Sequence, residues 1–241
     1  GYRPTLAKFT SAGARSTSHK INNDGELTTL KVTSNGTRYL AGNINGTNWP
    51  FNSNNRQGFI LKVLPNGAED WWRLFYNGNN NVTITPQKSF EIDSSENLYM
   101  CFKVRNHDKL SVIKYNSSGN QTWQVTLQGF NGSYCETSGL AIDSSGNVYV
   151  AGNENDNSNG IYNAFITKFN SAGNLQWSRK IRDVFAKSLE TDSSGNVFMV
   201  GLDASNNMQL VKWNSSGSIQ FQQKLSSNRS ERFEDIAIDS N

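Results

Sequence analysis

The stretch AIDSSGNVYVAGN, from Ala141 to Asn153, occurs in altered form several times along the chain. An apolar segment meets the turn-forming cluster Asp-Ser-Ser-Gly-Asn, after which Val148 and Val150 alternate with Tyr149, as on a half-buried strand. The stretch therefore predicts a β-hairpin. Related copies are VTSNGTRYL from Val32, IDSSENLYM from Ile92, TDSSGNVFM from Thr191 and IDSN from Ile238.

A second phrase lies between the copies of the first. In FITKFNSAGNLQW, from Phe165 to Trp177, alternating residues flank the turn cluster Asn-Ser-Ala-Gly-Asn, which predicts a second hairpin. Two hairpins make a unit of four strands, with strands a and b from the first phrase and c and d from the second. The second phrase reads LAKFTSAG from Leu6, ILKVLPNG from Ile60, VIKYNSSG from Val112, ITKFNSAG from Ile166 and LVKWNSSG from Leu210.

The first phrase recurs at intervals of 47 to 60 residues, which is typical of propellers and solenoids. A single four-stranded sheet cannot bury both of its faces, whereas sheets placed side by side around an axis cover one another. We therefore predict an all-β fold, a β-propeller of four-stranded antiparallel blades. The five c-d hairpins indicate about five blades, and an open β-solenoid is the alternative.

The two phrases resemble the SBBP-type β-propeller repeats of bacteria and phages. The first segment matches at Ile142, Asp143, Ser144, Ser145, Gly146, Asn147, Tyr149 and Gly152, and the second at Phe165, Lys168, Gly173 and Trp177. The resemblance covers nearly the whole chain and implies a propeller, but no activity, because propellers host lectins, enzymes and scaffolds alike.

The chain departs from the repeat at four positions, and we expect less regular blade edges there. Thr33 stands in place of the aspartate and Glu96 in place of the turn glycine, while Thr17 and Phe221 occupy the position of the last tryptophan.

We expect residues 1–241 to form a single propeller domain that starts at strand c of one blade and ends after strand a of another. Strand b lies between strands a and c in a blade, so pairing the two ends would leave a gap. The expectation is that the chain is part of a longer one in which at least one more b strand follows.

Composition excludes several classes of partner. The net charge is +3 with both signs interspersed, so we expect no nucleic acid partner. No apolar run approaches the roughly 18 residues of a membrane span, so we expect no membrane insertion. Cys101 and Cys135 belong to no metal-binding or disulfide pattern, and we expect two unpaired thiols, no metal and no cofactor.

In such a meander the b-c and d-a connections share one face, and four long polar segments fall on it: Asn43 to Gly58, Tyr76 to Gln87, Gln128 to Gly139 and Asn153 to Asn163. Aromatic rings beside amide groups suit a neutral polyhydroxyl ligand such as a glycan. The competing interpretation is that these residues only form turns and fill blade junctions. The candidate ligand-binding residues are Trp49, Phe51, Tyr76, Phe130, Tyr134, Asn155, Asp156 and Tyr162.

Recurring polar residues are better explained by the fold than by chemistry, because a catalytic group is needed once. We expect the turn aspartates to accept backbone N–H groups and the lysines to lie along blade surfaces. The aspartates are Asp93, Asp143, Asp192 and Asp239, and the lysines are Lys8, Lys62, Lys114, Lys168 and Lys212.

The sequence contains no recognisable catalytic motif. We therefore expect a non-enzymatic display or adhesion module on a cell envelope or virus particle, outside the cell, with surface glycans or neighbouring structural proteins as partners. One alternative is a glycan-active hydrolase or lyase, for which acids such as Glu26, Glu91, Glu190 and Glu234 would have to converge. The other is a structural spacer without a ligand.

Overall fold

The computed structural model describes residues 5–9, 11–12, 14–20, 25–45, 56–75, 82–83, 90–104, 109–128, 135–156, 161–225 and 235–239. Contacts between Cα atoms divide the chain into two compact units, residues 1–87 with 104–106 and residues 88–103 with 107–241. Within the described ranges the regular structure is entirely β, and no helix there is long and apolar enough to cross a membrane. That residues 1–241 form one domain stays a prediction.

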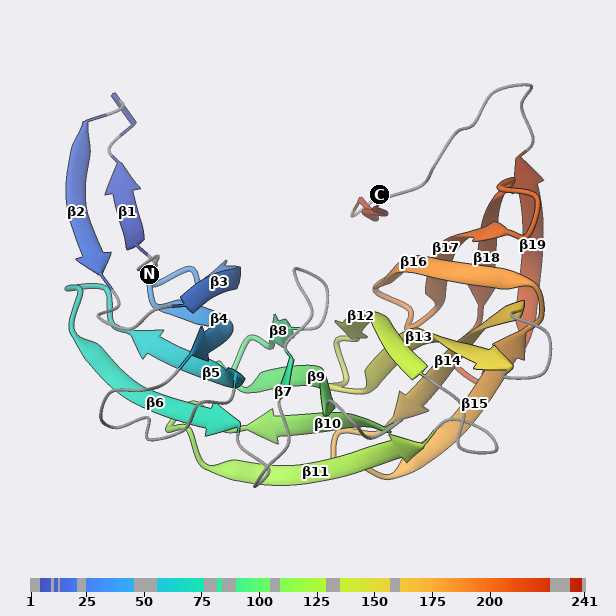
Figure 1. The fold of residues 1–241 in the computed structure, drawn as a ribbon, viewed down its shortest axis with the longest axis horizontal. Helices are drawn as coiled ribbons and strands as arrows, with labels where there is room; N and C mark the ends of the chain where they lie inside the picture. Colours follow the sequence, from blue (N-terminus) through green and yellow to red (C-terminus); the bar gives the residue numbers. More distant parts are fainter. Residues whose placement is uncertain are drawn as a thin grey trace. The chain divides into compact units, whose positions relative to one another are not determined.

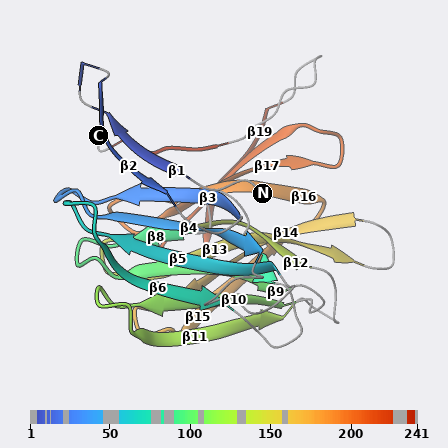
Figure 2. The ribbon, with the colours of Figure 1, turned by 60° about the vertical axis from the view of Figure 1, so that its left-hand side comes forward.

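The first unit contains one antiparallel hairpin, one four-stranded antiparallel sheet and a two-residue strand. Figure 2 shows the four strands of the sheet in chain order, β3, β4, β5 and β6. The side chain of Leu6 packs against the core of this sheet. The strands are β1 (Thr5–Phe9), β2 (Arg15–Lys20), β3 (Gly25–Val32), β4 (Arg38–Asn45), β5 (Arg56–Val63), β6 (Glu69–Phe75) and β7 (Val82–Thr83).

The second unit contains three sheets, β8 to β11, β12 to β15 and β16 to β19, in each of which the strands are antiparallel and follow chain order (Figure 1). The first strand of each sheet contacts the first strand of the next. The strands are β8 (Phe90–Ile92), β9 (Leu98–Val104), β10 (Lys109–Tyr115), β11 (Gln121–Gln128), β12 (Cys135–Ile142), β13 (Val148–Asp156), β14 (Ile161–Phe169), β15 (Leu175–Ile181), β16 (Val184–Thr191), β17 (Val197–Asp203), β18 (Met208–Trp213) and β19 (Ile219–Leu225).

All five predicted c-d hairpins are present, as β1–β2, β5–β6, β10–β11, β14–β15 and β18–β19. The four a-b hairpins whose strands are described, starting at Gly25, Phe90, Cys135 and Val184, also form. The hairpins predicted from the sequence are therefore confirmed for these copies.

An aspartate closes three of the four described a-b turns. Oδ1 of Asp143 accepts the N–H groups of Ser145 at 3.0 Å and Asn147 at 2.9 Å, and Oδ2 accepts the side-chain amide of Asn147 at 2.8 Å. Asp93 and Asp192 make the same three hydrogen bonds with their own neighbours. This confirms that the repeated aspartates accept backbone N–H groups, for the three whose turns are described.

The two irregular a-b turns keep the same geometry by other means. In the first copy, Thr33 donates to Oδ1 of Asn35 at 2.7 Å, and this oxygen accepts the N–H of Thr37 at 2.8 Å, so Asn35 takes the place of the aspartate. Glu96 adopts a φ of +59° in place of glycine, and its N–H still donates to the carbonyl of Asp93 at 3.0 Å. Both turns therefore keep their backbone hydrogen bonds, while the edge strand before Glu96, β8, has only three residues.

In the second unit, a tryptophan of one sheet contacts the c-d turn of the next sheet. Nε1 of Trp177 on β15 donates to the carbonyl of Ser215 at 3.1 Å, and Lys168 donates to the same oxygen at 2.9 Å. The ring lies against Gly217, where an added Cβ would be 2.7 Å from Cδ2 of Trp177. A larger side chain at position 217 would collide with the indole ring, so a glycine occupies this contact between the two sheets.

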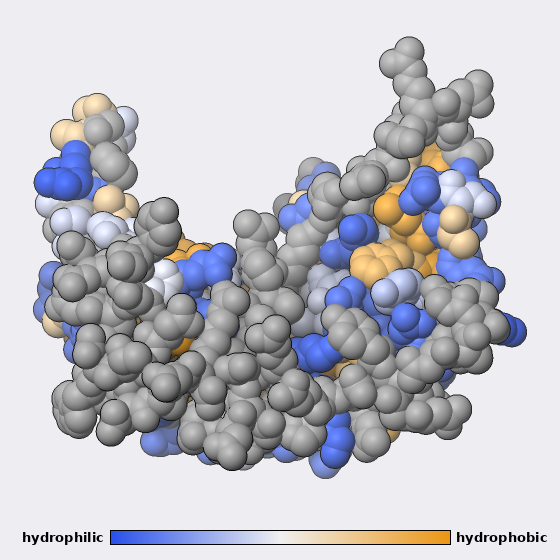
Figure 3. All heavy atoms as spheres, in the orientation of Figure 1, coloured by the Kyte–Doolittle hydropathy of each residue, from blue (hydrophilic) through white to orange (hydrophobic). Residues whose placement is uncertain are grey.

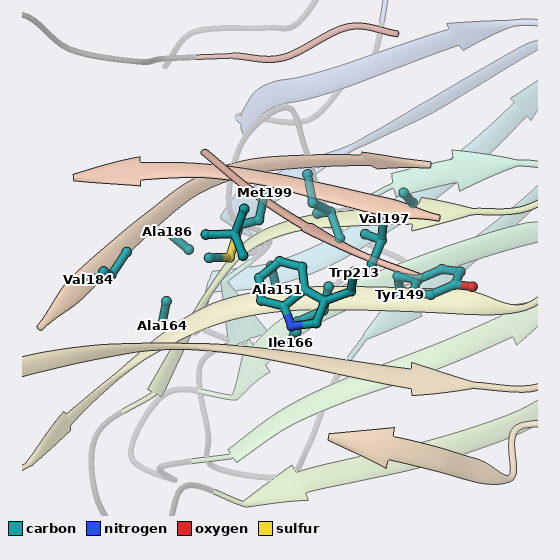
Figure 4. Close-up of a cluster of buried hydrophobic side chains, with 12 residues drawn as sticks. Tyr149, Ala151, Ala164, Ile166, Val184, Ala186, Val197, Met199 and Trp213 are labelled. Carbon is teal, nitrogen blue, oxygen red and sulfur yellow. The ribbon is translucent and has the colours of Figure 1, made fainter. Parts of the chain in front are cut away.

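A buried cluster fills the space between sheets β12–β15 and β16–β19. Figure 4 shows Trp213 of β18 in the middle of this cluster. Its ring is fully buried, and burying a side chain of this size contributes roughly 1.5–3 kcal/mol or more. Residues from both sheets surround it: Tyr149, Ala151, Ala164, Ile166, Val184, Ala186, Val197 and Met199.

Four of the five recurring lysines lie over aromatic rings, which accounts for their repetition. Each Nζ lies 4.7 to 5.7 Å from a ring centroid, a distance at which a cation and an aromatic ring attract. The pairs are Lys62 with Tyr39, Lys114 with Tyr99, Lys168 with Tyr149 and Lys212 with Phe198. The structural role predicted for these four is confirmed.

We expect Gly217→Ala to lower the free energy of unfolding by about 2–4 kcal/mol, because the new Cβ meets Trp177 and the residue has a φ of +81°. Urea denaturation of the purified chain measures this loss. Gly67→Ala is the matched control, since Gly67 has a φ of +93° and nothing within 4 Å of its Cβ position. Equal losses in the two variants would contradict a role for the tryptophan contact.

Candidate functional site

A pocket of about 260 Å³ opens in the second unit where β14 and β16 begin and β17 ends. These strand ends lie at the edge of the sheets opposite the Asp-Ser-Ser-Gly-Asn turns, on the side of the b-c and d-a connections. The lining residues are Tyr162, Asp183, Val184, Phe185, Leu202, Asp203 and Ala204.

The connections beside the pocket are short and tightly held. Only Arg182 and Asp183 join β15 to β16, and residues 204–207 join β17 to β18. Asp183 has a φ of +58°, its N–H donates to Oδ1 of Asn163 at 3.2 Å, and its carbonyl accepts the N–H of Ala204 at 3.2 Å. Because both connections are this short, they leave the ends of β16 and β17 open to form the pocket.

Aromatic and aliphatic side chains form the apolar part of the pocket. Val184 and Leu202 are buried, while the rings of Tyr162 and Phe185 meet edge to face with centroids 5.3 Å apart. Tyr162 remains 38% exposed, so part of its surface is accessible to a ligand. Figure 3 shows hydrophobic and hydrophilic side chains side by side over β16 and β17.

Asp203 is held by hydrogen bonds within its own turn. Its Oδ1 accepts the N–H groups of Ser205 and Asn207, both at 2.9 Å, and its Oδ2 lies 2.6 Å from Nζ of Lys224. Burial raises the pKa of Asp203, but the hydrogen bonds from Lys224 and Asn207 outweigh burial and hold this pKa well below its usual range. Asp203 is therefore ionised, and its oxygens already have partners.

Asp183 and Tyr162 supply the polar groups that remain available. The backbone of Asp183 is hydrogen-bonded on both sides, but its exposed carboxylate has no hydrogen-bond or ion-pair partner among the described residues. The hydroxyl of Tyr162 likewise has no hydrogen-bond partner within the described part of the chain. The lining of the pocket thus combines the aromatic residues Tyr162 and Phe185 with Asp183.

Of the eight predicted ligand-binding residues, the structure brings Asn155 and Tyr162 directly opposite each other on β13 and β14. The amide oxygen of Asn155 is buried and has no hydrogen-bond partner within the described ranges, although Asn155 does not line the pocket. Asp156 is the last residue of β13. The other five lie outside the described residues: Trp49, Phe51, Tyr76, Phe130 and Tyr134.

Strand residues occur in all four segments that were expected to be long loops. Residues 43–45 and 56–58 belong to β4 and β5, and residues 82–83 form β7. Residues 153–156 and 161–163 belong to β13 and β14, so Asn155, Asp156 and Tyr162 are strand residues, contrary to the loop expectation. Likewise Cys135 to Gly139 belong to β12. The reason is that these last two segments continue the antiparallel ladder, and polar residues in them pair with partners of the neighbouring strand.

Sequence reasoning missed Asp183, Phe185 and Asp203. One signal was available: Asp-Ala-Ser-Asn-Asn, residues 203–207, has the spacing of the Asp-Ser-Ser-Gly-Asn turn but falls between strands b and c instead of a and b. The candidate binding residues were taken from the long segments, and this segment is short. Asp183 and Phe185 carry no comparable signal, because they become neighbours of Tyr162 only through the packing of two sheets.

Both cysteines are buried in a cluster formed by residues of β9, β10, β12, β13 and β14 and are unpaired, as predicted. Burial raises the pKa of the Cys101 thiol to about 12, so little thiolate is present at neutral pH.

The acids considered for a catalytic role are placed on separate sheets. Glu26 lies on β3, Glu91 on β8 opposite Tyr99, and Glu190 on β16 opposite Phe198. Glu234 lies outside the described residues. None of the three described acids lines the pocket.

Residues 125–162, which run from β11 to the start of β14, match the SBBP family, a β-propeller repeat. This match confirms the resemblance to SBBP-type repeats on these residues. A search of the curated proteins found no match.

Solved structures with the same fold include two propeller-like chains. The Dos1 propeller has a TM-score of 0.63 at 11% identity, over 92% of this chain and 54% of that one. A PL25 polysaccharide lyase, an ulvan lyase bound to -[GlcA(1-4)Rha3S]-, has a TM-score of 0.53 at 14% identity, over 92% of this chain and 62% of that one. This chain thus spans little more than half their length, and the likeness concerns the fold alone. It confirms the predicted all-β propeller.

We expect Asp203→Ala to lower the free energy of unfolding at pH 7, and this loss to shrink as the pH falls. The folded state lowers the pKa of Asp203, so its ionisation stabilises the fold above the ordinary aspartate value of about 4, and this stabilisation is lost as the pH falls below that value. Urea denaturation at pH 7 and in steps from about pH 4 to pH 2 measures it.

Asp183→Asn is the control, because the Asp183 carboxylate has no partner within the described ranges and asparagine tolerates its positive φ. This variant should unfold like the parent. A loss from Asp203→Ala that is the same at pH 2 as at pH 7 would contradict the stabilising role of the ionised carboxylate.

Proposed function

We propose that this β-propeller, which carries an SBBP repeat, is a non-enzymatic carbohydrate-binding module that serves display or adhesion on the surface of a cell envelope or a virus particle. The observation that carries the proposal is the pair of rings, Tyr162 and Phe185, beside the carboxylate of Asp183 in one pocket. The partners would be surface glycans.

The chemistry of the pocket supports a sugar as the ligand. A sugar ring presents C–H groups on its faces and hydroxyl groups around its rim, so it needs apolar surface and hydrogen-bond acceptors together. Phe185 and Tyr162 offer the first and Asp183 the second. This combination of mostly apolar lining with a few polar groups is typical of small-molecule sites.

The size of the pocket favours the end of a glycan over its middle. Its volume of about 260 Å³ is slightly below the roughly 300–1,000 Å³ of pockets that enclose drug-sized ligands. One sugar unit can enter with its rim toward Asp183, while the rest of a chain would extend into solvent.

A hydrolase in this pocket is the weaker alternative, for a specific reason. A glycosidase needs one carboxyl group that stays protonated and can act as the acid. Asp203 lines the pocket, and its lowered pKa keeps it ionised, so it does not suit this role. The ulvan lyase has a similar fold at 14% identity, and this likeness concerns the fold alone, so it carries no argument for a lyase activity here.

We expect the labelled chain to bind selected sugars on a glycan array and intact microbial cells, and the double variant Tyr162→Ala, Phe185→Ala to bind about tenfold less or weaker. Losing both rings removes the apolar contact, and a tenfold loss corresponds to about 1.4 kcal/mol. Titration with the strongest array ligand measures the change in affinity.

Leu175→Ala is the matched control, because Leu175 is an exposed apolar residue, 61% accessible, next to the c-d turn at the other end of the same sheet as Tyr162. It should bind like the parent. A folded parent that binds no glycan, or a double variant that binds as well as the parent, would contradict the proposal.

A further inference from the structure

We infer that the pocket accepts an uncharged sugar unit whose neighbouring hydroxyl groups donate to Asp183, and that it rejects the same sugar when it carries a carboxylate. This inference rests on the proposed glycan binding and adds the class of sugar. It follows from which polar groups in the pocket are still available and from the charge that they carry.

The available polar groups are mainly acceptors. An ionised carboxylate accepts hydrogen bonds and donates none, so the groups that meet Asp183 must be donors. The second carboxylate, that of Asp203, is occupied by Ser205, Asn207 and Lys224. Adjacent hydroxyl groups of a sugar can donate one hydrogen bond to each oxygen of Asp183.

The charge of the pocket is negative. Lys224 offsets the charge of Asp203, with 2.6 Å between Nζ and Oδ2, but nothing in the described part of the chain offsets that of Asp183. The seven lining residues include no cation. A sugar carboxylate placed beside Asp183 would therefore meet a like charge.

One further cation, Lys187, lies over the ring of a residue that lines the pocket. Nζ of Lys187 lies 5.1 Å from the ring centroid of Phe185, and Lys187 does not line the pocket. A sugar carboxylate beside Asp183 would therefore find no cation among the lining residues to pair with. The pocket thus favours neutral sugars for two reasons. Their hydroxyl groups donate hydrogen bonds to Asp183, and the charge of Asp183 repels an anionic sugar.

The test compares pairs of sugars that differ only at C6, methyl galactoside with methyl galacturonide and methyl glucoside with methyl glucuronide. Each competes with the parent protein's array ligand. We expect the neutral member of the preferred pair to compete about tenfold or more better than its acid. This advantage should decrease as salt is added, because salt screens the repulsion.

Asp183→Asn identifies the residue responsible. Asparagine tolerates the φ of +58°, so the turn is retained while the charge is removed, and the preference for the neutral sugar should fall to less than about threefold. Asp70→Asn removes a negative charge from β6 in the first unit and serves as the control, which should keep the full preference. Urea denaturation verifies that both variants are folded.

The outcomes separate this inference from the proposed function. Neutral sugars that bind while their acids bind equally well or better would overturn the inference and leave the glycan-binding proposal standing. An unchanged preference in Asp183→Asn would also overturn it, by removing Asp183 from the explanation. A folded parent that competes with no sugar would overturn the proposed function and the inference together.

Discussion

The carboxylate of Asp143 carries hydrogen bonds that connect a local turn to the packing of two blades. Asp143 closes its own turn and also lies 3.1 Å from the hydroxyl of Tyr149, which is equally close to the carbonyl of Gly195 in the next sheet. The ring of Tyr149 in turn contacts Trp177. A local turn is thereby connected to the packing of two sheets, because one tyrosine takes part in both.

This arrangement makes the two edges of the sheets chemically different. At the turn edge, Trp177, Lys168 and Arg179 all donate to backbone carbonyls of the next c-d turn, so almost every position there has a structural partner. At the opposite edge the connections vary in length among the described residues. A binding site can develop at that edge because changes there do not disturb the contacts between turns.

The fold could be predicted from the sequence because the same physical problem is solved repeatedly. Each copy requires a side chain that accepts the N–H groups of the turn, apolar residues that alternate along a strand, and a residue that contacts the next sheet. In the central copy these are Asp143, Val148 and Trp177. Even the substitutions at Thr33 and Glu96 are tolerated by local means, through the Asn35 side chain and a left-handed backbone.

The pocket could be predicted only in part, because it depends on packing and not on repetition. Tyr162 was identified as an aromatic residue on the correct edge, but its partner Phe185 comes from the next sheet and no spacing in the sequence connects them. The length of a segment was also a poor guide. Asn153 to Asn163 continued the ladder of β13 and β14, whereas the site formed beside a connection of two residues.

The short connections hold the groups beside this pocket more firmly than long loops would. Asp183 is fixed by hydrogen bonds through both its N–H and its carbonyl, and Asp203 uses on this edge the same turn chemistry that Asp143 uses on the other. A ligand that meets groups held in this way has little chain to order on binding, so less of the contact energy is lost as entropy. The kind of turn that stabilises the blades thus also orders the pocket. The turn that Asp203 closes, between strands b and c, includes Ala204, whose N–H donates to the carbonyl of Asp183.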